Sequence, residues 1–212
     1  MTEAHQGFEA HVARLWEWID EHASKEALLK DSDGTMRSLQ RLVSDLFPGI
    51  AVEVAGQETA GRLTLALVFT AFANPEKAQI VRSIVASAPP GLHLPVKAFR
   101  PPVDRVEGLI FRGVTLADFL VRFSPAREGY RLDVFVDEWP LSSKRGESIW
   151  MLIQLALGEE SILEHIRQVR VHPQNGCRAG EEADQSDEGA MCGTRIREAF
   201  SAIATARRTW SH

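Results

Sequence analysis

The stretch GRLTLALVFTAFANPEKAQIVRSIVASAPPGLHLPVKAFR, residues 61–100, decides the fold of this chain. Its opening GRLTLALVFTA alternates and is rich in β-branched or bulky side chains, which predicts a strand. Asn74 is a favoured N-cap and Pro75 suits the first helical position, so a helix is predicted over 75–88. LPVKAFR (94–100) predicts a second strand, and a strand–helix–strand crossover makes the two strands parallel if they share a sheet.

The prolines of ASAPPGLHLPVKAFRPP, residues 86–102, are compatible with a binding loop or with the joint between the helix and the strand. Ala88 precedes Pro89, and a residue before proline disfavours continued α geometry. Prolines at both ends of a segment commonly mark the boundaries between secondary-structure elements. We interpret the stretch as a helix stop, a turn and a strand closed by Pro101-Pro102.

On the N-terminal side, apolar residues at helical spacing predict two helices and then a hairpin. One stripe predicts a helix from Phe8 to His22 that is compatible with continuation through KEALLK, giving a helix over 8–30. A second stripe predicts a helix over 35–47 that Pro48-Gly49 stops. Residues 50–56 alternate and are bounded by glycine, so they form the predicted hairpin partner of the strand at 61–71.

On the C-terminal side, three strands in succession, over 107–114, 119–123 and 129–139, suggest a meander. A helix apolar on nearly all sides is expected over 145–157, and a last strand over 165–172. The predicted class is α+β, with a mixed, largely antiparallel sheet of about six or seven strands and helices mainly on one face.

The predicted organisation is a single α+β domain over residues 1–172 followed by a tail. Residues 173–193 contain almost no large apolar residues and are dense in glycine and acids, which is typical of a flexible linker. Residues 194–212 predict a short amphipathic helix, with Ile196 and Phe200 on its apolar face. This helix is compatible with packing on the domain, binding a partner or staying mobile.

Charge and cysteine content exclude some classes of protein. The 212 residues carry a formal net charge of −5, which argues against a nucleic-acid-binding face, so no nucleic-acid partner is expected. Cys177 and Cys192 are not spaced for zinc, and we expect free thiols in a reducing compartment and no metal site. The N-terminus has no apolar signal segment and no apolar run spans a bilayer, so the expected location is cytoplasmic, without a membrane partner.

The sequence lacks the common catalytic motifs. It has no phosphate-binding P-loop, no dinucleotide-binding glycine fingerprint, no G-x-S-x-G elbow and no H-E-x-x-H. Active sites are also assembled from scattered residues, so these absences lower the expectation of an enzyme without removing it. No catalytic residue and no cofactor are predicted.

Three residues form the candidate ligand site. Arg100 and Arg105 flank the proline joint, and two such arginines, if they converge, suit a carboxylate or phosphate. Trp139 follows two acids at the predicted end of a strand and could contact a sugar, a cation or a partner protein. The alternatives are a solvated edge of arginines paired with nearby acids, and a tryptophan that caps the sheet edge.

A further cluster, EESILEH (159–165), contains three glutamates and His165. Two carboxylates and a histidine in this order could serve acid–base or metal chemistry with one further group. The favoured interpretation is a solvated turn before the last strand.

The joint between helix and strand resembles one in a group of bacterial α+β proteins, in which an AAP segment is followed by an AFRP-like segment. The matching residues are Ala88-Pro89, Lys97 to Pro101, and later Gly158-Glu159, whereas Leu94-Pro95 stands where the pattern favours an aromatic residue. The resemblance covers roughly residues 8–172. It implies an α+β fold, assigns no activity and transfers no catalytic residue.

Two functions remain open from the sequence. The first is a non-catalytic protein-binding or regulatory domain, since acidic charge suits encounter with a basic partner. The alternative is a binder of small anionic molecules, or an enzyme, with its site near Arg100, Arg105 and Trp139.

Overall fold

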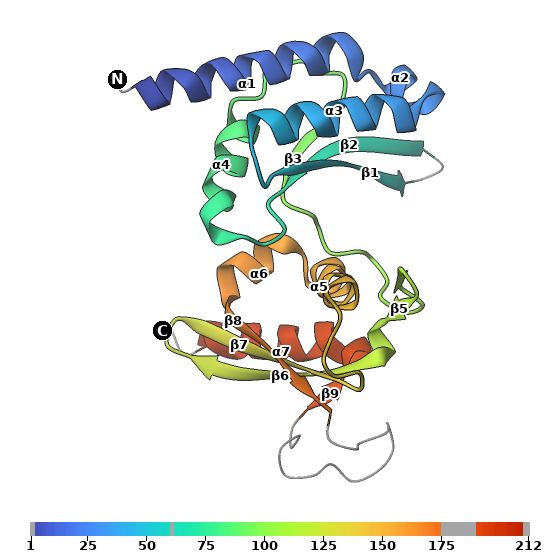
Figure 1. The fold of residues 1–212 in the computed structure, drawn as a ribbon, viewed down its shortest axis with the longest axis vertical. Helices are drawn as coiled ribbons and strands as arrows, with labels where there is room; N and C mark the ends of the chain where they lie inside the picture. The colour runs from blue at the N-terminus through green and yellow to red at the C-terminus, as the bar shows by residue number, and fades with distance from the viewer. Residues whose placement is uncertain (1–2, 60–61, 175–189, 210–212) are drawn as a thin grey trace. The chain divides into compact units, whose positions relative to one another are not determined.

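The computed structural model of the protein describes residues 3–59, 62–174 and 190–209 (Figure 1). The chain divides into two compact units, unit 1 (Met1–Arg100) and unit 2 (Pro101–His212). Units of this kind can belong to one folding domain or to two, so the single domain over 1–172 stays a prediction. Most of the predicted linker, including Cys177, lies outside the described residues.

Unit 1 packs helices on a three-stranded sheet. Its elements, in chain order, are α1 (Glu3–His22), α2 (Lys25–Lys30), α3 (Ser32–Leu46), β1 (Ala51–Thr59), β2 (Arg62–Thr70), α4 (Pro75–Ala86) and β3 (Val96–Ala98). The strand order is β1-β2-β3, with β1 antiparallel and β3 parallel to β2. The predicted hairpin and the parallel crossover are both confirmed.

The first helix ends at His22, as its apolar stripe predicts, but its continuation to residue 30 is wrong, because 25–30 form a separate helix. Ser24 has extended backbone geometry and its hydroxyl accepts a hydrogen bond from the backbone N–H of Ala27, so it acts as the N-cap of α2. The core of unit 1 lies between α1, α3 and the sheet, where Leu15, Leu39 and Phe69 are fully buried. α1 and α3 lie side by side in this unit (Figure 1).

Unit 2 is built on a four-stranded sheet with a separate small hairpin. Its elements are β4 (Ile110–Phe111), β5 (Val114–Thr115), η1 (Leu116–Asp118), β6 (Phe119–Ala126), β7 (Gly129–Val136), α5 (Ser143–Leu157), α6 (Glu159–His165), β8 (Ile166–Pro173), β9 (Met191–Cys192), η2 (Gly193–Arg195) and α7 (Ile196–Thr209). The strand order is β8-β7-β6-β9, with β8 parallel and β6 antiparallel to β7.

The class α+β is confirmed, but the single sheet of about six or seven strands is wrong. The described strands form three sheets of three, two and four strands. β3 is only three residues long, because Phe99 has φ +67° and the two prolines that follow cannot extend a ladder. The continuous strand predicted over 107–114 is replaced by β4 and β5, because Arg112 and Gly113 have φ +49° and +78° and turn the chain between them. The three-strand meander is therefore wrong as well.

The C-terminal helix α7 packs within unit 2. Ile196 is fully buried and Phe200 is nearly so, and the ring of Phe200 lies 5.8 Å from that of Phe123 on β6. The Nε of Arg197 donates to the backbone carbonyl of Ala156 at the end of α5, at 3.0 Å. The amphipathic pattern thus predicts the helix, and its apolar face is covered by β6 and α5.

Candidate functional site

Unit 1 has a groove between α1 and the loop that follows α4. The groove has a volume of about 800 Å³. One wall is α1, from Phe8 to Asp20, and the other contains the loop Pro89–Leu92. Twelve helical positions separate Phe8 from Asp20, so the groove extends about 18 Å along α1. That length matches about three turns of a bound helix.

Contacts of Trp16 with β2 and with the end of α4 fix the floor of this groove. Trp16 is almost completely buried, and its ring meets that of Phe69 on β2 edge to face, with 5.8 Å between centroids. The indole Nε1 of Trp16 donates to the hydroxyl of Ser87, at 3.3 Å, and Ser87 Oγ donates to the carbonyl of Ile84, at 2.7 Å. These hydrogen bonds connect α1 to the end of α4. The position of one wall relative to the other is therefore fixed by contacts within unit 1.

The groove combines an apolar floor with an acidic rim. Phe8, Val12 and Trp16 follow one another at helical spacing on α1. Glu9, Glu17 and Asp20 lie beside them on the same helix, and the lining contains no lysine, arginine or histidine. Among the residues that the structure describes, neither Glu17 nor Asp20 has an ion-pair partner. The groove therefore presents negative charge around an apolar surface.

The sequence favours a joint between helix and strand for the loop that forms one wall, with a binding loop as the alternative. The stretch 86–102 is the predicted helix stop, turn and strand, since α4 ends at Ala86 and β3 begins at Val96. Between them, Pro89, Pro90 and Gly91 are exposed and line the groove with Leu92. In the sequence, the feature that points to this loop is the succession Pro89-Pro90-Gly91, which indicates a turn as readily as one side of a binding groove.

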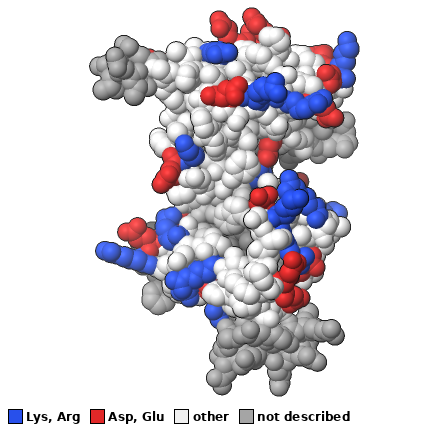
Figure 2. Space-filling model, in the orientation of Figure 1, with Lys and Arg blue, Asp and Glu red and all other residues white. Residues whose placement is uncertain are grey.

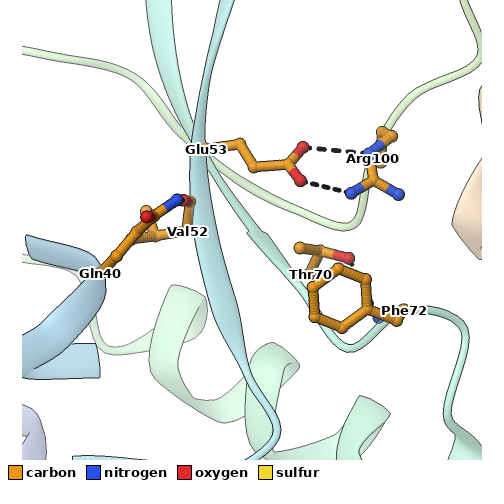
Figure 3. A network of polar contacts seen from close by, with 6 residues as sticks. All are labelled: Gln40, Val52, Glu53, Thr70, Phe72 and Arg100. Atoms are coloured by element: carbon orange, nitrogen blue, oxygen red, sulfur yellow. Dashed lines mark hydrogen bonds and ion pairs between the residues drawn. The ribbon is translucent and has the colours of Figure 1, made fainter. Parts of the chain in front are cut away.

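Arg100 lies in a polar corner at the end of β3 (Figure 3). Its side chain is 6% exposed, and its Nε donates to Glu53 Oε2 on β1 at 3.0 Å, while Nη2 donates to Glu53 Oε1. Figure 3 shows Val52 and Glu53 on opposite sides of β1, with Val52 toward Gln40 and Glu53 toward Arg100. The amide of Gln40 donates to the backbone carbonyl of Val52 at 3.3 Å.

The backbone around this corner is strained. Phe72 and Ala73 follow β2 with φ +53° and +58°, in the left-handed region that residues other than glycine seldom adopt. The Phe72 amide donates to Thr70 Oγ1 at 3.0 Å, and the Phe72 ring lies 5.9 Å from the Arg100 guanidinium carbon. Arg100 therefore packs against the turn that ends β2 as well as pairing with β1.

The three residues of the predicted ligand site fall in both units. Arg100 is buried in unit 1, whereas Arg105 and Trp139 belong to unit 2, where both are exposed. Trp139 is 55% exposed in the segment between β7 and α5. Their convergence on one ligand stays a prediction.

A second polar cluster lies on the four-stranded sheet of unit 2, around Asp133 on β7. The carboxylate is buried and accepts from Arg131 Nε at 3.1 Å and lies 3.0 Å from His172 Nε2 on β8. Arg122 on β6 approaches it to 3.7 Å. Burial raises the pKa of Asp133. The hydrogen bonds with His172 and Arg131, together with their charges, lower that pKa by more than burial raises it, so it lies below its ordinary value.

Asp133→Asn is expected to reduce the acid sensitivity of folding. A carboxylate whose pKa is lower in the folded chain stabilises it fully above the unfolded pKa, about 3.9, and this contribution is lost as the pH falls through the folded value. The free energy of unfolding should thus fall more steeply between about pH 4 and pH 2 in the wild type than in Asp133→Asn. Urea unfolding at several pH values measures the slopes. Asp137→Asn, an exposed aspartate on the same segment, should keep the wild-type slope, and equal slopes for all three chains would contradict the prediction.

The cluster at 159–165 is a helix and not the solvated turn that was expected. Glu159 is fully buried at the start of α6, while Glu164 and His165 lie at its end with 3.8 Å between them. No group of three histidines, cysteines or acids among the described residues is arranged to hold a metal ion. None of the described helices combines the length and the apolarity needed to cross a membrane.

Comparisons of the chain with protein-family models, with curated proteins and with solved structures found no match. Function is therefore inferred from the geometry of the two units alone. On the visible face of each unit, basic and acidic residues are interspersed (Figure 2), as the mixed charges of the sequence lead one to expect.

Proposed function

We propose that the protein is a non-catalytic binding module and that the groove of unit 1 accepts a basic amphipathic helix of a partner protein. The observation that carries this proposal is an apolar groove about 800 Å³ in volume whose lining contains three acids and no base. A helix that lays its apolar face into a groove is a recurrent mode of recognition between proteins. The acidic rim would select basic residues on the flanks of that helix and speed the encounter.

Several features support a helical partner over a small ligand. The groove follows α1 for about three turns, longer than a compact metabolite needs. Its polar groups are spread along the rim from Glu9 to Asp20 and do not converge on one point. The alternative, a binder of small anionic molecules, requires exposed cationic groups that converge, whereas Arg100 is buried against Glu53. That alternative stays a prediction about Arg105 and Trp139.

The test uses a labelled synthetic peptide of 14 residues, with leucines on one helical face and lysines on the other, about 21 Å long as a helix. Fluorescence anisotropy should show saturable binding that weakens as salt is raised, because rim charges contribute through screened interactions. A peptide with the same leucines and glutamates in place of the lysines should not bind.

Asp20→Lys should weaken this binding about tenfold, since an attractive charge becomes a repulsive one beside the bound lysines. Asp45→Lys is the matched control, because Asp45 is an exposed acid on α3 that does not line the groove. Leu92→Asp should also weaken binding, by placing a charge where the apolar face is expected to dock. Equal affinities of the Asp20 and Asp45 variants, or no binding of the basic peptide, would refute the proposal.

A further inference from the structure

The outer edge of β8 in unit 2 has the features of a second docking site, separate from the groove. β8 is the first strand in the order β8-β7-β6-β9 and pairs only with β7 among the described strands. It is eight residues long, from Ile166 to Pro173, and its residues 167–171 are exposed. An edge strand carries outward-facing backbone N–H and C=O groups that can pair with another strand.

The face of β8 toward α5 is apolar and incompletely covered. Val169 and Val171 are 38% and 39% exposed. They line a cavity of about 250 Å³ together with Val134 of β7, Leu141, and Ile149 and Trp150 of α5. A strand added beside β8 would direct every second side chain to this face, where an apolar residue would be shielded by Trp150 and the two valines.

The opposite face of β8 is cationic. Arg170 stands in register with Asp133 of β7, and Asp133 in turn is in register with Arg122 of β6, so the three residues form one row across the sheet. The single carboxylate of Asp133 is already engaged by Arg122, Arg131 and His172. Arg170 is exposed and has no ion-pair partner among the described residues. This face therefore carries more positive than negative charge.

We infer that the β8 edge binds an extended segment of a partner protein in which apolar residues alternate with acidic ones. Its backbone would continue the sheet, its apolar residues would cover Val169 and Val171, and its acids would lie beside Arg170 and His172. A second copy of this chain fits less well. Two β8 edges paired with each other would bring the Arg170 side chains of both copies onto a face that is already positive.

The experiment uses two labelled peptides of eight residues, one alternating valine with glutamate and one with the same residues in two blocks. The alternating peptide should bind the full chain, and hydrogen exchange should slow at those backbone amides of residues 167–172 that face away from β7, because strand addition gives them new partners. The block peptide should bind much more weakly, since only alternation separates apolar from acidic side chains.

Arg170→Glu should weaken the binding of the valine–glutamate peptide about tenfold and strengthen that of a valine–lysine peptide, because the cross-strand charge pair is reversed. Lys30→Glu, an identical change of charge on α2 of unit 1, is the matched control and should leave both affinities unchanged. Binding without protection of 167–172, equal binding of the two peptide orders, or no exchange of preference in Arg170→Glu would overturn the inference. A dimer of the free chain with residues 167–172 protected would assign the edge to a second copy instead.

Discussion

Arg100→Ala is expected to lower the stability of the chain by about 2–3 kcal/mol, and the Tm by about 4–12 °C. Arg100 is 6% exposed and makes two hydrogen bonds to Glu53, so its removal leaves that carboxylate without its cation and opens space beside Phe72. Breaking a fully buried ion pair typically costs about 3–5 kcal/mol, and the side chain of Glu53 is 36% exposed, which reduces the loss. Thermal unfolding followed by circular dichroism measures the change.

Arg112→Ala is the matched control for this effect. Arg112 pairs with Glu147 at 3.3 Å, but the two side chains are 61% and 65% exposed, so its loss should cost less than about 1 kcal/mol. If Arg100→Ala is as stable as Arg112→Ala, the Glu53 pair is not structural.

Gly158→Ala is expected to destabilise unit 2 by about 3 kcal/mol or more, and to lower the Tm by about 6–12 °C. Gly158 is both the C-cap of α5 and the N-cap of α6, with φ +80° and ψ 141°, a conformation nearly restricted to glycine. A Cβ atom at this position would lie 2.7 Å from Cδ and 3.1 Å from the backbone N of Pro102. Both the strain and the close approach act against alanine.

Gly146→Ala separates this effect from a general intolerance of alanine. Gly146 lies inside α5, and an added Cβ would meet only the side chain of Leu141, at 3.4 Å. Alanine is favoured over glycine in a helix by roughly 1 kcal/mol, so this variant should be as stable as the wild type or more stable. The prediction for Gly158 is wrong if its Tm falls no further than that of Gly146→Ala.

Most elements of unit 1 could be predicted because they carry their signals locally. Asn74 and Pro75 start α4, and the side chain of Asn74 accepts from the Glu76 amide as an N-cap should. The alternation of 61–71 and the crossover rule then place β3 parallel to β2. The sequence also predicts α7 from its apolar stripe, but its packing on β6 and α5 was one of three open alternatives.

The division of the strands into three sheets was not predictable from the same signals. An apolar, β-branched run such as 107–114 predicts extended chain, but it does not show that Arg112 and Gly113 will turn within it. The cap at Ser24 was missed for a similar reason. Apolar spacing continues across residues 23–24, and the only local sign of a break is the single serine that caps α2.

The groove, the polar corner and the open sheet edge depend on contacts between distant residues. Trp16 meets Ser87 across 71 positions, Arg100 meets Glu53 across 47, and Asp133 meets His172 across 39. Sequence alone determined where most of the helices and strands form, because capping, periodicity and proline placement act over a few neighbouring residues. Only the tertiary structure decided which charges are buried in pairs and which line a groove or an edge, because burial and pairing depend on residues brought together by folding.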